Sequence, residues 1–136
     1  MFFKKNKDKN DDLIKVTALL IYAAKIDENY TNKEEEIIKR TLLQIGANNS
    51  NIEEIMSSGK KIEENSNHIL EFTKEVKSME EQNKILIIEN LWRIIYSNED
   101  ADIYETNLMR RLAGLLYIDN KTMGDIKNKI KKEIQK

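Results

Sequence analysis

The sequence predicts an all-α fold of about seven helices, in a single domain with an internal pseudo-two-fold repeat. Three observations support this prediction. The 136 residues include no Pro and only four Gly, and they are rich in the straight-chain residues that favour helices. Apolar residues recur at helical spacing along most of the chain. Two segments with the same order of features also lie 71 residues apart.

The first predicted helix has an apolar face, formed by Leu13, Val16, Leu20, Ile21 and Ala24. Asn10, Asp11 or Asp12 is expected to cap it, because short polar side chains satisfy the free amides at a helix start. This start divides the chain into a basic N-terminal tail, residues 1–10, and a helical domain, residues 11–136.

Capping boxes predict the starts of further helices. In a capping box a Ser, Thr or Asp is followed three residues later by Glu, and the two residues satisfy each other's backbone amides. The boxes are Thr31/Glu34, Ser50/Glu53, Ser78/Glu81 and Asp102/Glu105. Each precedes apolar residues at helical spacing, and Gly46 is expected to end the helix that begins after Thr31.

The short segment after the Ser50/Glu53 box and two further helices complete the predicted set of seven. A short piece spans residues 52–56, a helix in the middle of the chain spans 69–76, and a Lys-rich helix spans 123–134. The linkers between them are short and rich in Asn, so nothing indicates a second domain.

The internal repeat brings the two acidic segments into correspondence. A shift of 71 residues places Asp27 on Asn98, and it places Arg40 on Arg111. Both copies then consist of a helix, an acidic turn and a capped helix. We therefore expect two helical hairpins related by a pseudo-two-fold axis.

Charge is unevenly distributed along the chain. Residues 1–10 carry a net charge of +3 and residues 121–136 carry +4, whereas the whole chain carries −1. The segment between these ends, residues 11–120, is therefore acidic, and this argues against nucleic-acid binding. The basic ends are either solvated tails or contacts for an anionic membrane or an acidic partner. With no Cys, no signal peptide and no apolar segment long enough to cross a bilayer, the protein is expected to be cytoplasmic.

Two acidic turns, residues 27–36 and 98–107, form the candidate functional site. Oxygen-bearing side chains occupy positions 27, 29 and 31, and again 98, 100 and 102, as in the first half of an EF-hand loop. The turns are not EF-hands, because Asn32 and Ile103 replace the required Gly and Ile38 and Met109 replace the final Glu. They could bind a hard cation, or they could only end one helix and begin the next.

Helix capping explains part of this acidity without a metal. Glu34 and Glu105 complete two of the capping boxes. His68 is the only histidine, so a transition-metal site of the usual type is excluded. Trp92 is expected in the core. No phosphate-binding loop or catalytic triad is present, and we expect no enzymatic activity.

Several segments resemble the TerB (tellurite-resistance B) family, whose repeated motif is roughly A-x-A-D-G-x-hydrophobic-x-x-x-E. The two copies in this chain are AKIDENYTNKE, residues 24–34, and IYSNEDADIYE, residues 95–105. LWRIIYS, NLMRRLAGLL and ILEFTKEV are similar to other family segments. The resemblance covers about residues 13–132.

The resemblance implies an all-helical fold of about seven helices and a divalent-cation site at the acidic turns. The candidate ligands are Asp27, Glu34, Asn98, Asp100, Asp102 and Glu105. Asn98 stands where the family has an acid, and the neighbouring Asp100 and Asp102 would restore the charge. Because all these ligands are oxygens, Ca²⁺ or Mg²⁺ is the expected ion.

The TerB family is linked to resistance to tellurite and other stress, through complexes at the inner face of the membrane. Related domains also occur in larger proteins, including co-chaperones. The resemblance thus implies a non-enzymatic, cation-binding domain with a protein partner, in a stress-response context. The alternative is a metal-free helical interaction module, of the adaptor or co-chaperone type, at the periphery of an anionic membrane.

Overall fold

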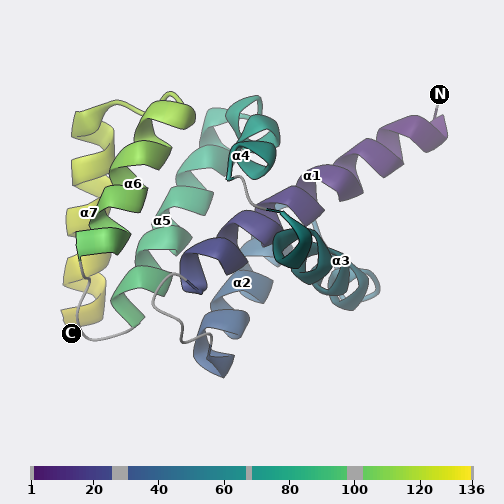
Figure 1. The fold of residues 1–136 in the computed structure, drawn as a ribbon, viewed down its shortest axis with the longest axis horizontal. Helices are drawn as coiled ribbons and strands as arrows, with labels where there is room; N and C mark the ends of the chain where they lie inside the picture. Colours follow the sequence, from purple (N-terminus) through teal and green to yellow (C-terminus); the bar gives the residue numbers. More distant parts are fainter. Residues whose placement is uncertain (1, 26–30, 67–68, 98–102, 136) are drawn as a thin grey trace.

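The computed structural model describes residues 2–25, 31–66, 69–97 and 103–135, with side chains for residues 10–25, 31–66, 69–97 and 107–134. Seven α-helices and no strand occur in these ranges (Figure 1). The helices are α1 (Phe2–Ala24), α2 (Asn32–Ile45), α3 (Ile52–Asn65), α4 (Leu70–Lys77), α5 (Glu81–Ser97), α6 (Ile103–Leu115) and α7 (Asn120–Gln135). The prediction of an all-α fold of about seven helices is confirmed.

The first and third helices are much longer than predicted. The first begins at Phe2, so Asn10, Asp11 and Asp12 lie inside α1 and do not cap it. Residues 2–10 contain no Pro or Gly, and nothing in them prevents the helix from extending toward the N-terminus. The short piece expected at residues 52–56 is the first part of α3, which has 14 residues.

Two of the four capping boxes are wrong. Before α3, the backbone amides of the turn are satisfied by Asn48 and not by Ser50. The Asn48 Oδ1 accepts hydrogen bonds from the backbone N–H groups of Ser50 (2.9 Å) and Asn51 (3.1 Å). Ser78 ends α4, and its hydroxyl donates to the Glu75 carbonyl at 3.1 Å. A short polar side chain can bond backbone groups on either side of it, so sequence spacing alone did not distinguish these roles.

The core is organised around α1, which packs against α2, α3, α4 and α5. Val16, Leu19 and Leu20 on this helix are completely buried. Figure 1 shows α1 crossing the molecule, with its N-terminal turns projecting beyond the other helices. Trp92 on α5 is 3% exposed, in agreement with its predicted place in the core.

The internal repeat is visible in the way corresponding helices end. Gly46 follows α2 with φ of 134°, which confirms it as the stop, and the Ala47 N–H donates to the Leu42 carbonyl at 2.9 Å. The equivalent position in the second copy is Tyr117, with φ of 59°, and the Ile118 N–H donates to the Ala113 carbonyl at 2.9 Å. Helix α7 packs on α5 as α3 packs on α1. Helix α4 lies between the two copies.

The basic C-terminal segment is not a solvated tail, because it forms α7 and contributes to the core. Ile126 and Ile130 are buried. The Lys129 ammonium pairs with the Glu89 carboxylate of α5 at 2.5 Å. At the start of α7, the Asp119 Oδ1 accepts a hydrogen bond from the Thr122 N–H at 2.6 Å, and this bond lowers the pKa of Asp119.

Candidate functional site

The described part of the first acidic turn is the start of α2, where the predicted capping box is present. The Glu34 Oε1 accepts hydrogen bonds from the Thr31 N–H (2.8 Å) and the Thr31 hydroxyl (2.9 Å). In return, the Glu34 N–H donates to the Thr31 hydroxyl oxygen at 3.3 Å. Glu34 is only 1% exposed, so the turn carries a buried carboxylate.

The other predicted cation ligands lie outside the described side chains. Asp27, Asn98, Asp100 and Asp102 fall outside the described residues altogether, as does His68. Glu105 lies in the first turn of α6, and its side chain is not described. Within the described ranges, no three His, Cys, Asp or Glu residues come close enough together to hold a metal ion. The cation site therefore stays a prediction.

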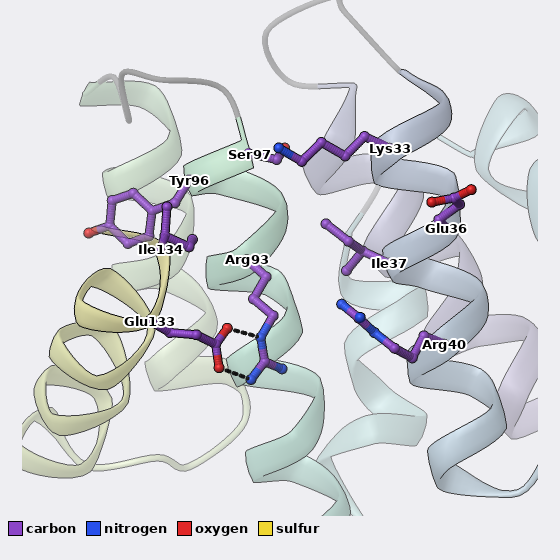
Figure 2. Close-up of a pocket in the computed structure, with 9 residues that line it drawn as sticks. All are labelled: Lys33, Glu36, Ile37, Arg40, Arg93, Tyr96, Ser97, Glu133 and Ile134. Carbon is purple, nitrogen blue, oxygen red and sulfur yellow. Dashed lines mark hydrogen bonds and ion pairs between the residues drawn. The ribbon is translucent and has the colours of Figure 1, made fainter. Parts of the chain in front are cut away.

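The described residues beside the two turns come together in space. Lys33 lies in the described part of the first turn, and Ser97 immediately precedes the second. Both residues line the same hollow. Figure 2 shows the Lys33 side chain extending from α2 toward Ser97 at the end of α5. Elements from both repeats thus meet at one end of the molecule.

This hollow lies between α2, α5 and α7 and has a volume of about 460 Å³. Its lining combines charged groups with an apolar wall. The lining residues are Lys33, Glu36, Ile37, Arg40, Arg93, Tyr96, Ser97, Glu133 and Ile134. A cavity of this size falls within the range of small-molecule sites, roughly 300–1,000 Å³.

An ion pair joins α5 to α7 at the wall of the hollow (Figure 2). The Arg93 Nε and Nη2 donate to the two oxygens of Glu133, at 2.7 and 2.9 Å. The Arg93 Nη1 also donates to the Asn90 Oδ1 at 3.0 Å, which helps to fix the guanidinium. The hydrogen bonds with Arg93 lower the pKa of Glu133, and those with Glu133 raise the pKa of Arg93.

On the other side of the hollow, one face of α2 presents two cations. Lys33, Ile37 and Arg40 follow each other at helical spacing, and Figure 2 shows all three directed toward α5. Glu36 points away from the hollow. Lys33 and Arg40 are exposed, and neither forms an ion pair within the described part of the chain.

Sequence analysis did not find this hollow. In the sequence, Arg40 was noted as the repeat partner of Arg111, and Arg93 as part of LWRIIYS, but neither was assigned to a binding site. Glu133 lies 40 residues from Arg93 in the chain. Only the packing of α7 on α5 brings the two together, and no spacing rule predicts such a contact.

A comparison with protein-family models shows to which family the chain is related. Residues 13–128 match the family model described as tellurite resistance protein TerB. The chain belongs to the TerB family. Comparisons of this TerB chain with curated proteins and with solved structures found no significant match. No helix in the described part of the TerB domain has the length and apolarity needed to cross a membrane.

The Arg93–Glu133 pair makes the stability of the TerB domain depend on pH in a defined direction. Because the folded-state pKa of Glu133 lies below its ordinary value of 4.5, the pair stabilises the fold above that pH. The contribution is lost as the pH falls through the lower, folded-state value. The Glu133 side chain is 48% exposed, so solvent screening limits the effect to about 0.2–1 kcal/mol.

We therefore expect Glu133→Gln to lower the free energy of unfolding at pH 7 and to have a smaller effect at about pH 3, because the contribution of the pair decreases as the pH falls below 4.5. Urea unfolding curves at the two pH values measure the difference. Glu54→Gln on α3 is the matched control, since Glu54 is exposed and the substitution changes the net charge by the same amount. A loss that is the same at both pH values would contradict the ion-pair explanation.

Proposed function

We propose that this TerB domain is non-enzymatic and binds a divalent cation at its two acidic turns. The observation that supports the proposal is that Lys33, within the first turn, and Ser97, which immediately precedes the second, line one hollow. The second turn, residues 98–107, begins directly after Ser97, and the first turn, residues 27–36, contains Lys33. Acids from the two halves of the chain can therefore contribute ligands to one ion.

The burial of Glu34 supports the same proposal. Removing a carboxylate from water is costly unless hydrogen bonds or opposite charges compensate it. Two hydrogen bonds from Thr31 to the Glu34 Oε1 supply part of this compensation. A cation bound at this turn would also favour the charged form of the carboxylate. Because the candidate ligands are carboxylate and amide oxygens, Ca²⁺ or Mg²⁺ is the ion proposed.

The test is a calorimetric titration of metal-free protein with Ca²⁺ and then with Mg²⁺. We expect a dissociation constant below about 1 mM, as in established protein sites. The double variant Asp27→Asn/Glu105→Gln removes the charge of one candidate ligand in each turn and should weaken binding by at least about tenfold, which corresponds to 1.4 kcal/mol. Glu34 is left unchanged, because its loss would also remove the cap of α2.

The matched control is Glu54→Gln/Asp125→Asn, which removes the same charge from exposed positions on α3 and α7. Equal weakening in the two double variants would indicate general charge attraction. An absence of heat, together with an unchanged melting temperature at saturating cation, would contradict the proposal outright.

The cellular context is proposed from the family. The description of the matching model as a tellurite resistance protein supports a role in tellurite or stress response. We propose a cytoplasmic location at the inner face of the membrane, with a protein partner that the domain recruits. Neither catalysis nor nucleic-acid binding is part of the proposal.

A metal-free interaction module is the alternative, and the course of α1 favours it. The N-terminal turns of this helix project beyond the other helices (Figure 1). Residues 1–10 include four Lys and one Asp. A projecting basic segment is suited to an anionic membrane or an acidic partner. If the titration detects no cation binding, this alternative becomes the preferred function.

A further inference from the structure

We propose that the hollow between α2, α5 and α7 binds a small organic anion, in which a phosphate or carboxylate head is joined to an apolar body. The proposal is independent of the cation site, because it rests on described side chains of the hollow and not on the acidic turns. Its volume of about 460 Å³ suits a small molecule.

The head group would bind between Arg40 and Arg93. Figure 2 shows the Arg40 side chain directed from α2 toward Arg93 on α5. Glu133 pairs with Arg93, whereas Arg40 has no ion pair within the described residues. One carboxylate is therefore available for two facing guanidinium groups. The Glu133 carboxylate attracts Arg40 as well as Arg93, but its hydrogen bonds go to Arg93. An anion placed between the two guanidinium groups would accept charge-assisted hydrogen bonds from the planar Arg40 group.

The remaining acid of the hollow does not oppose this arrangement. Glu36 lines the rim but points away from α5 in Figure 2. Lys33, at the Ser97 end, adds a second positive charge without an ion pair in the described part of the chain. The inner surface of the hollow thus carries excess positive charge in a protein whose net charge is −1.

The apolar body would contact Ile37, Tyr96 and Ile134. Ile134 is 44% exposed, although it belongs to the wall of a hollow. The Tyr96 ring stacks on Trp92, with centroids 5.6 Å apart, and this contact holds the ring in place. A flat or aliphatic group would remove this apolar surface from water. The combination of a fixed aromatic ring, aliphatic side chains and a few converging polar groups is typical of small-molecule sites.

The test uses phenyl phosphate as the probe, titrated calorimetrically into the full chain at physiological salt. We expect saturable binding with a dissociation constant of about 1 mM or less, and at least about tenfold weaker binding of inorganic phosphate, which lacks the apolar body. Arg40→Gln should weaken phenyl phosphate binding by about tenfold, the usual consequence of losing a charged hydrogen bond.

Matched variants distinguish a built site from general attraction. Arg110→Gln removes the same charge from an exposed position on α6 that does not line this hollow, and it should leave the affinity unchanged. Glu133→Gln frees Arg93 and should tighten binding several-fold, while Glu54→Gln should not. Ile134→Ser should weaken phenyl phosphate binding without changing that of inorganic phosphate.

Two results would overturn the proposal. One is an absence of phenyl phosphate binding at about 10 mM, where even a weak site would be half occupied. The other is an equal loss of affinity in Arg40→Gln and Arg110→Gln. Because these titrations contain no divalent cation, their outcome is separate from that of the Ca²⁺ and Mg²⁺ experiment.

Discussion

Replacing Phe72 with Ala is expected to lower the free energy of unfolding by about 3–5 kcal/mol, as is usual when a large aromatic side chain is removed from a core. Phe72 lies on α4 and is 1% exposed. Helix α4 has only eight residues, too few to be stable on its own. Its position therefore depends on the side chains that it buries against α1, and the cavity left by Ala would weaken this contact directly.

Leu70→Ala provides the control on the same helix, since Leu70 is 51% exposed. Its expected cost is within about 0.5 kcal/mol, as for most surface positions. Urea unfolding measured by circular dichroism gives both values. Similar losses in the two variants would show that α4 is not anchored through Phe72. A stability loss above about 5 kcal/mol would unfold a marginal domain, so Phe72→Leu is a milder second variant.

Gly59→Ala is also expected to destabilise the fold, by about 1–3 kcal/mol, because it overpacks the crossing of α1 and α3. A Cβ added at Gly59 would lie 2.4 Å from the Thr17 Cγ2 and 2.6 Å from the Thr17 Cβ. Thr17 is completely buried, and its hydroxyl donates to the Leu13 carbonyl at 2.8 Å. A β-branched side chain held in this way cannot rotate aside, so the helices themselves must separate.

Gly124→Ala is the matched control. Gly124 lies within α7, and an added Cβ would meet no atom within 4 Å. Here Ala should stabilise the protein by up to about 1 kcal/mol, because Gly is a poor residue inside a helix. Chemical unfolding of both variants tests the difference in sign. A gain in stability at Gly59 would show that α1 and α3 do not approach each other closely.

Local sequence signals predicted most of the helices correctly. The apolar spacing after Ser78 and after Asp102 led to α5 and α6, and the Thr31/Glu34 box predicted the start of α2. These signals succeed because helix formation and capping involve residues three or four apart. The Ser50/Glu53 and Ser78/Glu81 boxes failed because Asn48 and Glu75, on the N-terminal side of each Ser, accept its hydroxyl hydrogen bond instead.

The candidate cation site was predicted only as a set of positions. Of its six residues, Glu34 is the one whose side chain the structure describes, and its capping role was foreseen. The depth of its burial was not foreseen, because it depends on how α2 packs against α1 and α5. Lys33 and Ser97 lie 64 positions apart in the chain, and their shared hollow likewise arises from packing.

By itself, the sequence determined the helical class, the repeat over 71 residues, the TerB family and the stop at Gly46. Each of these depends on residue composition, spacing or order along the chain. Only the tertiary structure decided the close crossing at Gly59, the Arg93–Glu133 pair and the hollow that contains Arg40. These features join residues distant in sequence, and their geometry is set by how whole helix faces pack to bury apolar surface.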